Sequence, residues 1–197
     1  WATWKERSVF KPDKDKQTEL KVVIEKDSDD TVANAIRYIL LHEIGHSLGV
    51  ISGVHSSWNS SPVVSNKYPF TTLSWKMSDG KVESLFDDMM PQRRFIRSYS
   101  FGASRLSSDQ IENLYAVIFD NTNFPTIHAA TDIWEDFAET FTTYMHVIKE
   151  RKPYEVQINT ADNLKINYRS CWEKGMCMDK KKFMDQWLKD PLNYKGK

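Results

Sequence analysis

The sequence predicts an α+β domain, and three stretches of the chain carry this prediction. The run at residues 20–24 (LKVVI) is rich in β-branched residues, which is typical of a strand. Residues 31–48 and 131–148 each place apolar side chains three or four positions apart, the spacing of an amphipathic helix. The chain has 197 residues with 40% hydrophobic content, enough to enclose one core. We therefore expect a single domain over 1–197, with 151–197 as a helical C-terminal extension.

The first predicted helix is expected to lie beneath a small sheet and to bury its apolar side. That side is formed by residues at helical spacings: Val32, Ala35, Ile36, Ile39, Leu40, Ile44 and Leu48. Asp29 and Asp30 precede the helix, where carboxylates cap free N–H groups and favour the positive end of the helix dipole. Gly49 is expected to end the helix in a left-handed conformation.

This helix carries the segment His42-Glu43-Ile44-Gly45-His46. Side chains four residues apart lie on one helix face, so His42 and His46 are suited to two corners of a zinc tetrahedron. Glu43, beside the first histidine, is placed to take a proton from a metal-activated water, as in metallopeptidases. The segment therefore predicts one zinc ion per chain, held by His42 and His46, with Glu43 as the general base.

The third zinc ligand has two candidate sources. In one arrangement a third histidine follows a glycine turn after the helix. Gly49 fits that turn, but the ligand position is Ser52, and His55 comes three residues too late. In the other arrangement a glutamate comes from a later helix, which favours Glu135.

The second predicted helix begins at Thr131, a fair N-cap, and offers two glutamates one turn apart. Its apolar face consists of Ile133, Trp134, Phe137, Ala138, Phe141, Tyr144, Met145 and Ile148. Glu135 is expected to bind the metal, while Glu139 orients a ligand histidine from behind.

The two motifs together resemble the glutamate-zincin metallopeptidases, including the catalytic domain of anthrax lethal factor and the clostridial Pro-Pro endopeptidases. The resemblance covers about residues 20–150 and implies a zincin-like catalytic domain. It also implies that Glu135 is the zinc ligand and that Glu139 supports the ligand set. The group has an oxyanion-binding tyrosine seven residues before the ligand glutamate, and this chain has His128 there. We expect His128 to take that catalytic role, and the alternative is a neutral structural histidine.

The predicted function is a zinc-dependent endopeptidase that acts on a protein or peptide substrate. An alternative is a non-catalytic zincin-fold binding module that recognises a surface or host protein, and a third reading is the catalytic part of a toxin. Lys+Arg and Asp+Glu are balanced at 27 each, so no net charge favours nucleic acid. No apolar run is long enough for a transmembrane helix.

Cys171 and Cys177 are expected to form a small disulfide loop rather than remain free thiols, which favours an exported protein. The resemblance implies a bacterial protein, so we expect it to be secreted, periplasmic or at the cell surface. The chain begins at Trp1 rather than methionine, which indicates a processed form or an excised domain. Ser107 and Gln110 predict a capping box that opens a helix through Phe119. A short helix is predicted over 179–188. Five tryptophans are expected in core or packing positions: Trp58, Trp75, Trp134, Trp172 and Trp187.

Overall fold

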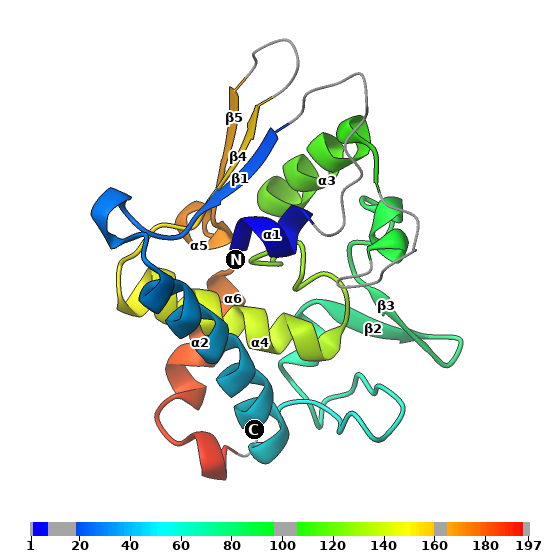
Figure 1. Cartoon of the computed structure of the whole chain (residues 1–197). Coiled ribbons are helices and arrows are strands. Elements are labelled where there is room, and N and C mark those ends of the chain that lie inside the picture. Colours follow the sequence, from blue (N-terminus) through cyan, green and yellow to red (C-terminus); the bar gives the residue numbers. More distant parts are fainter. Residues whose placement is uncertain (1, 8–18, 97–105, 160–164, 195–197) are drawn as a thin grey trace.

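The computed structural model describes residues 2–7, 19–96, 106–159 and 165–194, which form an α+β fold (Figure 1). The helices are α1 (Ala2–Arg7), α2 (Val32–Ile51), α3 (Ser108–Asn121), α4 (Ile133–Thr143), α5 (Cys171–Lys174) and α6 (Met178–Trp187). The strands are β1 (Glu19–Val23), β2 (Trp75–Ser78), β3 (Lys81–Ser84), β4 (Glu155–Asn159) and β5 (Lys165–Arg169). The predicted α+β class is confirmed.

Strand β1 pairs antiparallel with β4, and β4 pairs antiparallel with β5, so the sheet has the order β1-β4-β5. Leu20 and Val22 alternate with exposed neighbours on β1, as expected for a strand with one buried face. The second sheet is the β2–β3 hairpin, in which Trp75 pairs with Ser84. The predicted strand at 20–24 is therefore confirmed to within one residue.

Helix α3 packs beside β5 and confirms the predicted capping box. The Ser107 hydroxyl accepts a hydrogen bond from the Gln110 N–H (3.4 Å), and the Gln110 side chain accepts one from the Ser107 N–H (2.9 Å). Four apolar residues of α3 are buried: Ile111, Leu114, Tyr115 and Ile118. The predicted helix at 179–188 is observed as α6.

Helix α2 exists as predicted, but its predicted buried face was wrong. Val32 (78% exposed), Ile36, Leu40 and Ile44 face solvent. The buried residues of α2 are instead Tyr38, His42, Gly45, His46 and Gly49. The helix packs mainly against α4 rather than beneath the sheet, and Figure 1 shows the two helices crossing. The expectation of an active-site helix under the small sheet is therefore corrected.

The close crossing of α2 and α4 explains why the face with the glycines is buried. A Cβ atom on Gly45 would lie 3.0 Å from Cα of Ala138, which is tighter than nearly all real Cβ contacts. A Cβ on Gly49 would lie only 2.4 Å from Nε2 of His55. Helix α2 continues to Ile51, so Gly49 lies within the helix and does not end it as predicted. This close contact between the two helices requires small residues, so the face of α2 that carries the glycines and the histidines packs against α4.

Helix α4 begins one residue later than predicted, because Asp132 and not Thr131 is its N-cap. Oδ1 of Asp132 accepts hydrogen bonds from the N–H groups of Trp134 and Glu135, both at 2.9 Å. After Thr143 the chain continues as a π-helical segment, Tyr144–Lys149. The start of α4 is therefore held by a side-chain cap next to Glu135.

The short helix α1 places two charged side chains in the interior. Thr3 anchors it to β1, since its hydroxyl accepts a hydrogen bond from the Val22 N–H at 3.0 Å. Lys5 and Glu6 are 4% and 2% exposed, and Glu6 accepts a hydrogen bond from the Tyr115 hydroxyl. Burial raises the pKa of Glu6 to about 7, although the bond from Tyr115 opposes the rise.

We expect Glu6→Gln to stabilise the protein above pH 7. The pKa of Glu6 is higher in the folded state than its ordinary value of 4.5, so the folded state holds the proton more tightly. The stability from this group is complete below pH 4.5 and is lost as the pH rises through 7. The variant should gain about 3 kcal/mol at most in its free energy of unfolding. Urea unfolding of both proteins at pH 5 and pH 8 measures this gain. A stability difference between variant and wild type that is no larger at pH 8 than at pH 5 would contradict the prediction.

A disulfide joins Cys171, the first residue of α5, to Cys177, directly before α6, as predicted. Behind α4, α6 contributes Phe183, Met184 and Trp187 to a core cluster that also contains Phe137. Within the described ranges, no helix is both long and apolar enough to cross a bilayer.

Candidate metal centre

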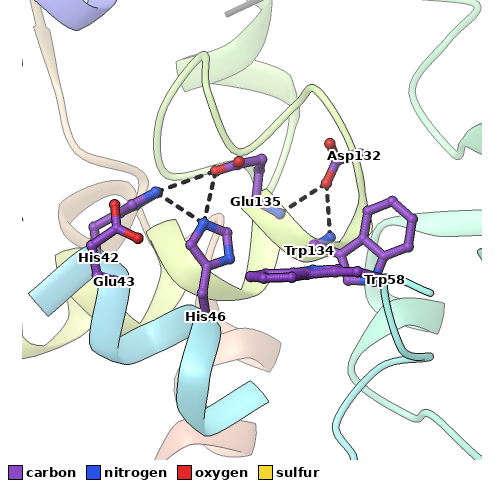
Figure 2. Close-up of a pocket in the computed structure, with 7 residues that line it drawn as sticks. All are labelled: His42, Glu43, His46, Trp58, Asp132, Trp134 and Glu135. Carbon is purple, nitrogen blue, oxygen red and sulfur yellow. Dashed lines mark hydrogen bonds and ion pairs between the residues drawn. The ribbon is translucent and has the colours of Figure 1, made fainter. Parts of the chain in front are cut away.

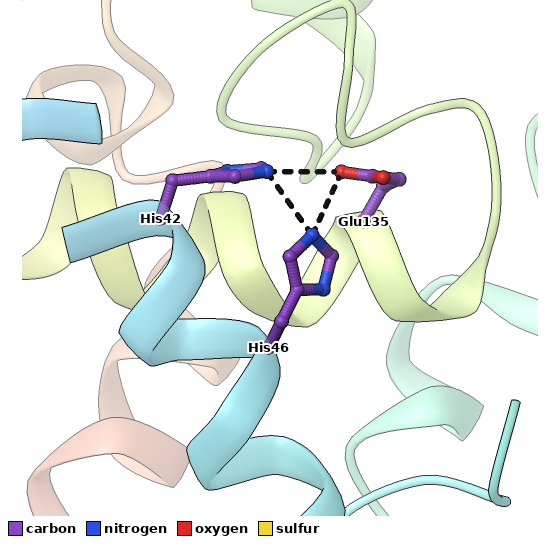
Figure 3. A group of neighbouring side chains, drawn as sticks. All are labelled: His42, His46 and Glu135. Carbon is purple, nitrogen blue, oxygen red and sulfur yellow. Dashed lines mark hydrogen bonds and ion pairs between the residues drawn. The ribbon is translucent and has the colours of Figure 1, made fainter. Parts of the chain in front are cut away.

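Three predicted ligand side chains meet at the crossing of α2 and α4 (Figure 3). Nε2 of His42 lies 3.1 Å from Nε2 of His46. Oε2 of Glu135 lies 3.4 Å from both of these nitrogens. Among the residues that the structure describes, these three are the group of His, Cys, Asp or Glu side chains whose donor atoms come close enough to hold a metal.

The triangle of donor atoms fits tetrahedral zinc. Zinc ligands lie about 2.0–2.1 Å from the ion, which puts neighbouring donor atoms of a tetrahedron about 3.3–3.4 Å apart. The edges here are 3.1, 3.4 and 3.4 Å. Two imidazoles and one carboxylate are also a donor set that zinc uses in catalytic sites, where a fourth position stays open.

Buried polar groups contact the Nδ1 side of the His42 ring, away from the donor triangle. Its Nδ1 lies 2.7 Å from Oε1 of Glu139, the position expected for a carboxylate that orients a ligand histidine. Glu139 in turn accepts a hydrogen bond from the Thr126 hydroxyl (2.7 Å) and forms an ion pair with Lys5 of α1. With Nδ1 directed at Glu139, Nε2 of His42 faces the other two donor atoms.

His128 lies against the third ligand. Its Nε2 is 2.8 Å from Oε2 of Glu135, and its side chain is only 2% exposed. It is not among the residues that line the adjacent pocket. This placement favours a role in orienting Glu135, and the oxyanion role of His128 stays a prediction.

The local charges keep Glu135 ionised and His42 basic. Burial opposes ionisation of Glu135, but hydrogen bonds from His128, His42 and His46 outweigh it and hold the pKa of that carboxyl far below its usual range. Burial also opposes protonation of His42, yet Glu135 and Glu139 raise its pKa to about 9. A metal ion at this site would therefore displace a proton from His42 at neutral pH.

A pocket of about 450 Å³ opens beside the donor triangle (Figure 2). Its lining residues are His42, Glu43, His46, Trp58, Asp132, Trp134 and Glu135. Glu43 is exposed, so its carboxylate reaches the same space as the ligand histidines. The pocket thus combines the predicted ligands with the predicted base.

The two rejected ligand candidates have other roles. Ser52 is the C-cap of α2, and its hydroxyl accepts a hydrogen bond from Nε1 of Trp187 at 3.3 Å. His55 is buried, donates a hydrogen bond from Nδ1 to the Ser56 carbonyl (3.0 Å) and packs against Phe137. Neither belongs to the donor triangle.

Several residues of the site were not found from the sequence. Lys5 and Thr126 contact Glu139, and Asp132 caps the helix that carries Glu135. Trp58 was expected in a packing position but is 51% exposed and lines the pocket. Only Asp132 had a sequence signal, because an aspartate three residues before a first-turn glutamate is a common N-cap pattern.

Comparisons with protein-family models, with curated proteins and with solved structures found no match for this chain. The resemblance to the glutamate zincins therefore depends on the two motifs alone.

Proposed function

We propose that this chain is a zinc-dependent endopeptidase with a zincin-like catalytic domain. The observation that carries the proposal is the donor triangle of His42, His46 and Glu135, with Glu43 in the same open pocket. Zinc in such a site would supply Lewis acidity, which polarises a peptide carbonyl and makes a water molecule acidic near neutral pH.

Individual residues of the chain then have separate roles in catalysis or in positioning the ligands. Glu43 takes the proton from the attacking water and delivers it to the amine that leaves. Glu139 keeps His42 in the orientation that directs Nε2 toward the metal, and His128 does the same for Glu135. A binding module would need the two histidines and Glu135 but has no use for a free carboxylate at Glu43, so we favour the enzyme.

The disulfide between Cys171 and Cys177 supports export from the cytosol, because such bonds persist in oxidising compartments. We propose a secreted, periplasmic or cell-surface location in a bacterium, where the substrate would be a protein or peptide. Intact mass with and without reductant, on protein purified from its source, tests the redox state directly. Free thiols in that sample would argue against export.

A digest of a diverse peptide library tests the activity. We expect cleavage by the zinc-loaded protein, loss of cleavage after treatment with a chelator, and recovery when zinc is added back. The protein should carry about one equivalent of zinc by elemental analysis. Zinc-loaded, folded protein that cleaves no peptide would contradict the enzyme and favour the binding module.

A further inference from the structure

The pocket beside the donor triangle has two aromatic walls. Trp58, from the loop after α2, sets its indole across the ring of His46, with a centroid distance of 5.2 Å and an interplanar angle of 73°. Trp134, in the first turn of α4, forms another part of the lining. Figure 2 shows both indoles beside His46 and Glu135. An indole that is half exposed next to a reaction site offers apolar contact area to a ligand.

The loop that carries Trp58 is fixed by hydrogen bonds at Ser56, two residues before it. The Ser56 carbonyl accepts hydrogen bonds from Nε1 of Trp134 at 2.7 Å and from Nδ1 of His55 at 3.0 Å. The Ser56 hydroxyl accepts another from the Val63 N–H at 3.1 Å. Because His55 is itself buried, the base of the loop is tied to the protein interior.

Trp58 itself lies in a tight turn that begins at Ser57. The Ser57 carbonyl accepts a hydrogen bond from the Ser60 N–H at 3.1 Å and another from the Ser60 hydroxyl at 2.7 Å. The Ser57 hydroxyl accepts one from the Asn59 N–H at 3.3 Å. These hydrogen bonds fix the backbone that carries the indole, which reduces the conformational entropy lost when a ligand contacts it.

The charges around the pocket limit which side chains it accepts. The lining includes the carboxylates of Glu43, Asp132 and Glu135, and no lysine or arginine is among the described lining residues. These carboxylates repel an acidic side chain. A metal ion held by Glu135 would offset part of this negative charge without reversing it. An uncharged apolar side chain avoids the repulsion and gains contact with the two indoles.

We propose that this pocket binds a bulky uncharged side chain of the substrate, aromatic or large aliphatic, next to the cleaved bond, and that Trp58 determines this specificity. The proposal rests on the peptidase function given above. It assigns Trp58 a contact with substrate, and it assigns the hydrogen bonds of Ser56 the role of holding that contact in place.

The binding test uses zinc-loaded Glu43→Gln protein, which keeps the pocket while removing the base. The probes are blocked glycine peptides with one variable residue, either Phe, Leu, Gly, Glu or Lys, measured by ligand-observed NMR. We expect Phe and Leu peptides to bind about tenfold or more tightly than the Gly peptide. In the Glu43→Gln background, Trp58→Ala should abolish this difference and Trp58→Phe should retain most of it.

Val32→Ala is the matched control. Val32 is an exposed apolar residue on the same helix as His46, but about 21 Å along the helix axis from it. It should leave the peptide preference unchanged, and every variant should hold the same amount of zinc. Cleavage by protein with Glu43 intact adds a second readout: residues flanking the cut bonds should be enriched in bulky apolar types in wild type but not in Trp58→Ala.

The outcomes separate this inference from the peptidase function. Binding of Phe and Leu peptides without cleavage by the wild type would leave the apolar site standing and contradict the hydrolysis. Cleavage without apolar enrichment, or enrichment that survives Trp58→Ala, would overturn the inference and leave the peptidase standing. A preference for Lys or Glu peptides would also overturn it. If the protein neither binds nor cleaves the peptides, both proposals are overturned.

Discussion

Glu43→Gln is expected to lower peptide turnover by about 10²- to 10⁴-fold, the usual contribution of a positioned general base. Glutamine has nearly the same size and shape as glutamate but does not accept a proton at neutral pH. Glu43 is exposed in the pocket and is not one of the three donor residues, so the variant should keep its zinc and its fold. Turnover of a cleaved library peptide, zinc content and thermal unfolding measure these three properties.

Glu83→Gln is a suitable control, because Glu83 lies on the β2–β3 hairpin outside the pocket. It should leave turnover unchanged. If Glu43→Gln retains most of the wild-type activity, Glu43 is not the base. Loss of zinc from this variant would instead show that Glu43 takes part in metal binding.

Glu135→Ala is expected to weaken zinc binding by more than about 100-fold. Loss of an outer partner of a zinc ligand alone costs about 10–100-fold in affinity, and loss of the ligand itself should cost more. The substitution also removes the carboxylate that faces Nε2 of both His42 and His46, at 3.4 Å from each. Competition with a chromophoric chelator at fixed pH measures the dissociation constant.

His55→Ala is the matched control, since it also removes a buried side chain close to α2. It should reduce the free energy of unfolding, because a packed ring is lost beside Gly49 and Phe137. The zinc affinity of the folded protein should change by less than the effect of losing one outer contact, about tenfold. The reverse pattern, with His55→Ala weakening zinc and Glu135→Ala not, would place the third ligand in the loop after α2.

The existence of the main helices followed from the sequence, but the buried face of α2 did not. Periodic apolar residues predict a helix because the pattern is local, and the capping box at Ser107 and Gln110 is likewise local. Helix α2 has two candidate inward faces, one apolar and one with two glycines and two histidines. The crossing with Ala138 of α4 selects the second, and a contact so distant along the chain leaves no trace in the periodicity.

The residues of the candidate site likewise include some that the sequence predicted and some that it did not. His42, Glu43 and His46 follow from helix geometry over a single turn. Glu135 required a guess about which later helix packs nearby, supported by Glu139 one turn on. Lys5 reaches Glu139 because α1 packs against β1, and Trp58 reaches His46 because its loop is tied to Trp134. Both contacts depend on tertiary structure, so residue type and spacing did not predict them.

The most direct test of the metal centre is a crystal structure of the zinc-loaded protein with diffraction data collected on both sides of the zinc absorption edge. The donor triangle predicts one strong anomalous peak about 2.0–2.1 Å from Nε2 of His42, Nε2 of His46 and a carboxylate oxygen of Glu135. A peak bound by other side chains, or no zinc peak in protein crystallised with excess zinc, would contradict the assignment.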